Sequence, residues 1–304
     1  MTQADNKLPC SDGSIYMFAG KGGVGKTTCA AATALHLASL GQKTLAISTD
    51  AAPSLNHIYE ISDGNKPIRV DDFLDIAELG VEEINQMWDK KFGREVYEIF
   101  SAFVAVDYDN FIEFTNSMLP GLSDEFMVDY IMELKRCRKY QAIVWDTAPL
   151  GQTLALLKTP AMLVEHLKMA PRVYSRFKLG RDSRDSVLDI LKRWKKLSAD
   201  CVDFLRDEVI FNMVTIPEAL AYEQLDGIFE ELNRFGFRVE QLIINNVIKT
   251  IDSEFLVAKA GQQRKYIEMI HDRFCHLKIV ELPMSPYEIK GLARLKWIET
   301  NLFV

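Results

Sequence analysis

A glycine-rich loop at residues 20–28 constrains this chain more than any other feature. It reads Gly-Lys-Gly-Gly-Val-Gly-Lys-Thr-Thr and matches the phosphate-binding pattern G-x-x-x-x-G-K-[ST]. Backbone N–H groups of such a loop turn inward around a polyphosphate, and the positive end of the following helix faces the same anion. An apolar run at 14–19 precedes the loop and an apolar helical stretch at 29–40 follows it. This strand–loop–helix order favours a nucleotide site over a glycine turn that binds nothing.

The residues of the loop have distinct expected parts in binding. We expect Lys26 to contact the β- and γ-phosphates and the Thr27 hydroxyl to ligate Mg²⁺. The predicted ligands are therefore ATP and Mg²⁺. The loop residues expected at the nucleotide are Gly20, Lys21, Gly22, Gly23, Val24, Gly25, Lys26, Thr27 and Thr28.

A second lysine, Lys21, directly follows the first glycine of the loop. One lysine already neutralises much of the β/γ charge, so a phosphate loop does not require another. We interpret Lys21 as a catalytic residue that reaches the phosphates of a second subunit, as an arginine finger does in trans. A solvated surface lysine is the alternative.

Composition and charge limit the class of protein. The chain has 304 residues, of which 48% are hydrophobic and 26% charged, as in ordinary globular proteins. Its formal net charge of −7 argues against a nucleic-acid partner. No stretch approaches the roughly 18 apolar residues that a membrane helix needs, and residues 1–10 lack the apolar core of a signal peptide. We expect a soluble, cytoplasmic protein.

The cysteines are far apart and no two form a C-x-x-C pair. This removes the usual sequence signature of a structural zinc site or a thioredoxin-type couple. We expect Cys29 to pack in the helix after the loop. The five positions are 10, 29, 137, 201 and 275.

Apolar runs alternate with helical stretches along the chain, the pattern of an α/β fold with a mostly parallel sheet and helices on both faces. We expect strands at 14–19, 43–49, 141–145, 208–215, 241–248 and 277–282. Two helical segments, at about 70–140 and 152–205, interrupt the alternation. Because no linker or repeat separates them, we expect residues 1–304 to form one domain with two helical insertions.

Two acidic residues stand at the carboxyl ends of predicted strands. Asp50 follows the second strand and Asp146 a later one. Ligands bind at this edge of open α/β sheets. We expect Asp146 to hold the Mg²⁺ shell through water, and Asp50 to orient the attacking water as a catalytic residue. Each acid alone would more often be a helix N-cap, but two acids beside a complete phosphate loop favour the site.

Together, the motifs resemble those of the deviant-Walker ATPases, in particular the arsenite-pump ATPases and the guided-entry ATPases for tail-anchored membrane proteins. The resemblance covers most of the chain. It is carried by residues 20–28, Ser48-Thr-Asp50, Pro120-Gly121 with Glu125, Asp146-Thr-Ala-Pro149, Ile216-Pro-Glu218 and Glu288-Ile-Lys-Gly291.

The resemblance implies ATP hydrolysis in a symmetric homodimer, with Lys21 acting across the interface and residues 146–152 sensing the nucleotide. It also implies that Asn245 contacts adenine and that Pro283 and Met284 lie beside the base. In the targeting branch, the helical layer would form an apolar groove for a client's transmembrane helix, and a membrane receptor is a possible further partner.

The chain departs from the family pattern in three places. Residues 51–57 read Ala-Ala-Pro-Ser-Leu-Asn-His, so the first switch is altered. The zinc-binding C-x-x-C would fall near Ser253 and Leu256 and is missing. The arsenite-binding cysteine set has no counterpart, and the chain is one half-unit rather than a tandem pair.

Two apolar stretches on the helical insertions are candidates for the groove or for plain core. One runs from Phe100 to Leu119. The other, at 154–169, contains methionine, which suits a promiscuous surface. Its residues predicted to line the groove are Leu157, Met162, Leu163 and Met169.

Three functions therefore compete. The favoured one is a nucleotide-gated targeting factor for tail-anchored membrane proteins. The second is the ATPase subunit of an arsenite or metal-related transport or insertion system. The third is a spatial regulator of the partition or septum-site kind. A possible amphipathic C-terminal helix at 289–303 is the one feature that supports the spatial regulator, although we expect this helix to pack on the sheet.

Overall fold

The structure is a computed structural model that describes residues 13–49, 54–61, 67–101, 107–112, 120–147 and 187–303. The chain divides into two compact units, which are treated separately. The sheet unit comprises residues 1–79, 137–151 and 206–304. The helical unit comprises residues 80–136 and 152–205.

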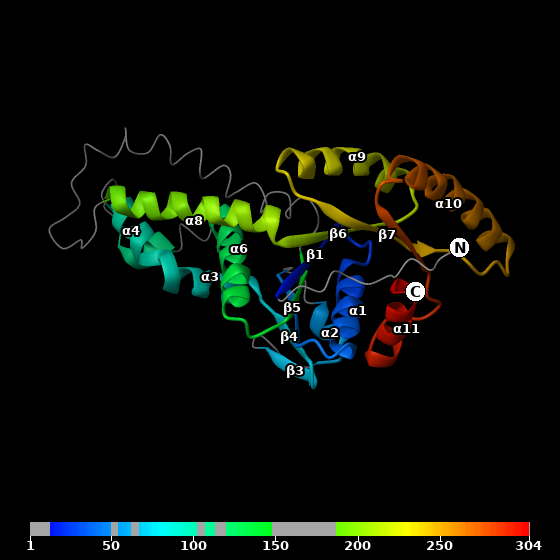
Figure 1. The fold of residues 1–304 in the computed structure, drawn as a ribbon, viewed down its shortest axis with the longest axis horizontal. Coiled ribbons are helices and arrows are strands. Elements are labelled where there is room, and N and C mark those ends of the chain that lie inside the picture. The colour runs from blue at the N-terminus through cyan, green and yellow to red at the C-terminus, as the bar shows by residue number, and fades with distance from the viewer. Residues whose placement is uncertain are drawn as a thin grey trace. The chain divides into compact units, whose positions relative to one another are not determined.

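The sheet unit is built on one eight-stranded sheet, in the order β3-β4-β2-β5-β1-β6-β7-β8 (Figure 1). Neighbouring strands are parallel except β3 and β4, which are antiparallel. Strand β1 lies between β5 and β6, so the loop that follows β1 is central. The strands are β1 (Ser14–Gly20), β2 (Thr44–Ser48), β3 (Ile68–Asp71), β4 (Leu74–Glu78), β5 (Ala142–Asp146), β6 (Val209–Thr215), β7 (Val239–Val247) and β8 (Lys278–Pro283).

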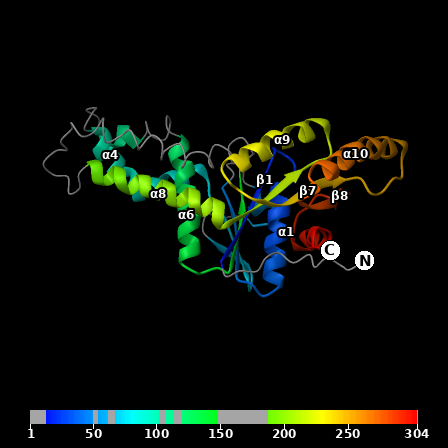
Figure 2. The same cartoon turned by 45° about the horizontal axis from the view of Figure 1, so that its top comes forward.

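Helices cover both faces of this sheet, as Figures 1 and 2 show. Helices α1 and α11 pack against each other on one face, and α9 and α10 cover the other. The short α2 contacts α1 and β4. The bounds are α1 (Lys26–Ser39), α2 (Leu55–Ile58), α9 (Ala219–Arg234), α10 (Glu254–Arg273) and α11 (Leu292–Leu302).

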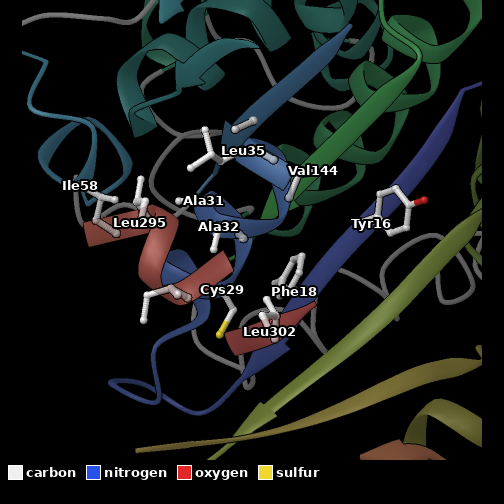
Figure 3. Close-up of a cluster of buried hydrophobic side chains, with 14 of the residues drawn as sticks. Tyr16, Phe18, Cys29, Ala31, Ala32, Leu35, Ile58, Val144, Leu295 and Leu302 are labelled. Carbon is white, nitrogen blue, oxygen red and sulfur yellow. The ribbon is translucent and has the colours of Figure 1, made fainter. Parts of the chain in front are cut away.

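The buried core beside the phosphate loop lies between the sheet and helices α1 and α11, with a contribution from α2. Alanines on α1 let the helix approach the strands closely, and Leu295 and Leu302 of α11 close the cluster from outside (Figure 3). Burial and the nearby Asp146 carboxylate raise the pKa of the Cys29 thiol to about 12, so this cysteine is an inert packing residue as expected. Helix α11 packs into this core, as expected. The amphipathic C-terminal helix therefore no longer supports a spatial regulator.

Six predicted strands are confirmed as β1, β2, β5, β6, β7 and β8. The expected helical segment from about residue 70 begins too early, however. Residues 68–71 and 74–78 form β3 and β4, and the first helix of that segment begins at Val81.

In the described part of the helical unit, ion pairs and aromatic contacts connect the helices. Lys91 forms ion pairs with Asp129 and with Glu133 of α6, and Arg193 of α8 donates to Glu95 of α4 at 2.9 Å. None of the helices in the described residues is long and apolar enough to cross a membrane. The elements are α3 (Val81–Trp88), a π-helical segment η1 (Asp89–Gly93), α4 (Arg94–Ser101), a helical turn at 108–112, α6 (Pro120–Arg136) and α8 (Val187–Asp207), whose last two residues belong to the sheet unit.

Candidate nucleotide-binding site

The phosphate loop connects the end of β1 to the start of α1, at the centre of the sheet. A Cβ at Gly20 would lie 2.3 Å from the Val214 carbonyl oxygen, so only glycine lets β1 and β6 approach at this point. Gly25 has φ +95°, a left-handed conformation that favours glycine. Val24 is buried and anchors the loop in the core. The backbone therefore favours glycine at positions 20 and 25 independently of any ligand.

The two lysines of the loop lie in different environments. Lys26, the first residue of α1, is only 6% exposed, and its Nζ donates to the Lys21 carbonyl oxygen at 3.4 Å. Its ammonium thus lies under the loop, where a β/γ-phosphate would be held. The Lys21 side chain is exposed, together with Gly22 and Gly23. An exposed lysine on the rim of the loop is compatible with contact to a second molecule and with a solvated surface residue.

The Thr27 hydroxyl, the predicted Mg²⁺ ligand, lies in the first turn of α1 beside the half-buried Thr28. Thr27 Oγ1 is 3.2 Å from Ser54 Oγ, which joins α1 to the residue that precedes α2. A serine hydroxyl and a threonine hydroxyl are hard oxygen donors of the kind that Mg²⁺ accepts.

Glu78 at the end of β4 fixes this second hydroxyl. Its carboxylate accepts backbone N–H groups from Ser54 at 2.7 Å, Leu55 at 3.0 Å and Asn56 at 3.3 Å. These are the N–H groups at the start of α2, which have no partner within the helix. Glu78 was not among the residues predicted from the sequence. Recognising residues 74–78 as a strand that ends in an acid would have revealed it.

Asp146 lies at the carboxyl end of β5 and is 1% exposed. Its carboxylate accepts from Ser48 Oγ at 3.3 Å, and its backbone carbonyl accepts from Thr49 N–H at 3.1 Å. The next residue, Thr147, donates its hydroxyl to the Phe18 carbonyl oxygen at 2.7 Å. These bonds hold the end of β5 against β1 and β2, so the carboxylate lies beside the first turn of α1. Its position is compatible with a role in the Mg²⁺ shell.

Asn245 near the end of β7 contacts the phosphate loop from the other side. Its Nδ2 donates to the Val24 carbonyl oxygen at 2.8 Å, and a Cβ at Gly25 would lie 2.2 Å from the same nitrogen. At the end of β8, Pro283 is half-buried and Met284 is 43% exposed. The Met284 N–H donates to the Val247 carbonyl at 2.9 Å, which joins this segment to β7. The predicted base-side residues thus lie on adjacent strands.

Several predicted residues lie outside the described part of the chain. These are Asp50, the switch residues from 148 onward, and the groove residues Leu157, Met162, Leu163 and Met169. In the first apolar stretch, Phe111 is buried against Tyr97 and Tyr108 and is therefore a core residue.

The position of the missing C-x-x-C has a structural role of its own. Ser253 is the N-cap of α10, and its side chain accepts from the Leu256 N–H at 3.3 Å. Within the described residues, no group of three or more His, Cys, Asp or Glu side chains is placed to hold a metal ion.

Comparisons with known proteins agree on one family. The family model described as anion-transporting ATPase matches residues 14–303. An Aquifex aeolicus protein named arsenical pump-driving ATPase 2 is 30% identical over 293 residues, which cover 93% of this chain and 96% of that protein. A Chlorobaculum tepidum protein named arsenical pump-driving ATPase is 29% identical, covering 95% of this chain and 75% of its own length. ATPase GET3A of Arabidopsis thaliana is 28% identical, covering 91% and 80%.

Proposed function

The chain belongs to the anion-transporting ATPase family and is an ATPase, and from this premise we propose that it is a homodimeric, nucleotide-gated targeting factor for tail-anchored membrane proteins. The resemblance inferred from the motifs is thereby confirmed at the level of the family. The observation that best supports a nucleotide-driven function is the position of Lys26, which is buried beneath a glycine-rich loop and is followed directly by Thr27.

In the proposed mechanism, the nucleotide binds at the carboxyl edge of the sheet. Lys26 and the loop N–H groups would hold the phosphates, Thr27 would ligate Mg²⁺, and Asp146 would bind the ion through water. Bound there, Mg²⁺ would neutralise charge that develops on the phosphate oxygens. Asp50 would orient the attacking water. Asn245, Pro283 and Met284 would contact the base.

The homodimer is proposed from the family resemblance, and the exposure of Lys21 on the rim of the loop leaves this lysine accessible to a second subunit. A lysine that completes the partner's site makes hydrolysis depend on association. In this proposal, ATP stabilises a closed dimer and hydrolysis with product release opens it.

Mixing two inactive variants tests the trans role directly. Lys21→Ala keeps a complete phosphate loop but supplies no lysine to its partner, whereas Lys26→Ala cannot hold its own nucleotide but still supplies Lys21. A mixed dimer would contain one complete site, so the mixture should regain ATPase activity that neither variant has alone. No recovery at any mixing ratio, although co-purification through an affinity tag on one variant shows mixed dimers, would reject trans action.

For the client, we propose a groove on the helical insertions, lined by Leu157, Met162, Leu163 and Met169. Burial of apolar surface is favourable by roughly 25 cal/mol per Å², so even a partly covered helix would be held against aggregation. The protein would carry such clients through the cytoplasm to a membrane receptor.

Capture of a protein with a C-terminal transmembrane segment, in the presence of a non-hydrolysable ATP analogue, tests this function. Aspartate at Leu157, Met162 and Met169 should abolish capture and spare ATPase activity. Leu220→Asp is the matched control, because Leu220 is an apolar side chain that is 55% exposed on α9. Unimpaired capture by the triple variant would place the groove elsewhere. Loss of ATPase activity with unfolding would identify the three residues as core.

The relatives named as arsenical pump-driving ATPases support a second candidate, the energising subunit of an arsenite or metal-related system. An added metalloid could reach only exposed thiols. Of the cysteines in the described residues, Cys137 and Cys275 are exposed, whereas Cys29 and Cys201 are buried. Stimulation of ATPase activity by arsenite, absent with client peptide, would favour this candidate over targeting.

A further inference from the structure

Strand β7 is distorted next to Asn245. Its parallel pairing with β8 shifts register between Ile244 and Val247, and Asn246 has φ 59°. Asparagine tolerates this left-handed conformation better than most residues do. An irregularity of this kind redirects the neighbouring side chain. Asn246 is exposed, whereas Asn245 turns inward to the phosphate loop.

Gln263 on α10 clamps the two sides of this distortion. Its Nε2 donates to the Asn246 carbonyl oxygen at 2.9 Å, and its Oε1 accepts from the Ile248 N–H at 2.9 Å. One side-chain amide thus satisfies a donor and an acceptor that the distorted strand cannot pair within the sheet. The residue between them, Val247, is fixed separately through its carbonyl by the Met284 N–H.

We propose that Gln263 is a positioning residue for the base side of the nucleotide site, acting through the backbone at 246–248 on Asn245. This inference rests on the proposed role of Asn245 as a base contact. Both amide hydrogen bonds of Gln263 go to the backbone at 246 and 248, directly after Asn245. We therefore expect its effect to pass through the orientation of the Asn245 side chain towards the base.

The test compares Gln263→Met with Gln262→Met. Methionine keeps nearly the length of glutamine but makes neither amide hydrogen bond, and Gln262 is the exposed neighbour on the same helix. Calorimetric titration with ATP, GTP and inorganic tripolyphosphate separates the base from the phosphates. Gln263→Met should weaken ATP about three- to tenfold, the loss expected from one impaired hydrogen bond. The same variant should reduce the preference for ATP over GTP and leave kcat nearly unchanged while KM rises. Gln262→Met should change none of these.

A second variant keeps the test informative if Gln263→Met does not fold. Gln263→Glu retains an acceptor for Ile248 N–H but loses the donor to Asn246, so it should also weaken ATP and reduce the preference over GTP. Tripolyphosphate affinity should stay within about twofold of wild type in either variant, because the loop N–H groups and Lys26 are unchanged. Equal losses for all three ligands would indicate general damage to the loop and overturn the inference.

Combination with Asn245→Ala distinguishes failure of the inference from failure of its premise. If Gln263 acts through Asn245, the effect of Gln263→Met on ATP affinity disappears in the Asn245→Ala background. Additive effects overturn the positioning role of Gln263. If Asn245→Ala alone leaves the ATP-over-GTP preference unchanged, the base contact itself is wrong and the inference falls with it.

Discussion

Replacing Glu78 with alanine removes a carboxylate that holds the start of α2 against the nucleotide site. The carboxylate accepts three backbone N–H groups, from Ser54, Leu55 and Asn56. Leu55 is fully buried, so its N–H group is left without water, a cost of about 1–3 kcal/mol. Ser54 and Asn56 are half-buried, and each lost charge-assisted bond costs about 1 kcal/mol after water replaces it. We expect the free energy of unfolding to fall by about 3–5 kcal/mol.

Urea unfolding followed by circular dichroism measures this change. Glu78→Gln keeps one side-chain oxygen for the closest two N–H groups and should lose about half as much. Glu223→Ala, at an exposed glutamate on α9, should change the free energy of unfolding by less than about 0.5 kcal/mol. Because Ser54 Oγ lies beside Thr27 Oγ1, Glu78→Ala should also require more Mg²⁺ for half-maximal ATPase activity. A free energy of unfolding for Glu78→Ala equal to that of Glu223→Ala would refute the reasoning.

Three further predictions follow from single side chains. Lys26→Ala should remove detectable Mg-ATP binding in a calorimetric titration, since the phosphates lose a buried cation; near-normal affinity would reject the loop assignment. Asp50→Asn should bind ATP but hydrolyse it much more slowly in a steady-state assay, because an amide is a poorer acceptor for the attacking water; wild-type turnover would move that role elsewhere. Lys91→Met should lower the free energy of unfolding at pH 7 by about 3–5 kcal/mol, because it leaves the buried Asp129 carboxylate without its cation, whereas Lys90→Met at the exposed neighbour should be nearly neutral. Burial raises the pKa of Asp129 against the lowering effect of Lys91, and removing the lysine raises it further. The deficit of Lys91→Met should therefore shrink as the pH falls and the carboxyl takes up a proton; a deficit that grows towards acid would contradict this account.

The central strands were predictable because each is a largely apolar run of the length of a buried strand. Strand β4 was not, because Leu74-Asp-Ile-Ala-Glu78 carries two acids where a buried strand should be apolar. The structure explains the exception. Asp75 accepts from the Tyr140 hydroxyl at 2.9 Å, and Glu78 accepts the N–H groups at the start of α2. A buried acid is tolerated when it is hydrogen-bonded, and partners so distant in the chain leave no local signal.

The loop motif was predictable for a different reason: its glycines are needed wherever a backbone turns tightly around an anion. What holds the loop in place was not. Thr147 supports β1 from 129 residues away, and Asn245 supports Val24 from 221 residues away. A motif match therefore identifies the chemistry of the loop but not the residues that fix its position.

The residues around the site come from strands on both sides of β1. On one side, Glu78 on β4 fixes the start of α2 and Asp146 on β5 bonds to the end of β2. On the other side, Asn245 on β7 contacts the loop itself. Because β7 is the penultimate strand in the chain as well as in the sheet, the Asn245 contact to the loop forms only after most of the chain has been incorporated. In an isolated peptide, the strand–loop–helix at 14–39 would lack each of these contacts and would leave the N–H groups of the loop unoriented. The phosphate site therefore depends on residues from several strands of the sheet and not on the loop motif alone. Substitutions at Glu78 or Asn245 should alter nucleotide binding, although neither residue belongs to the motif.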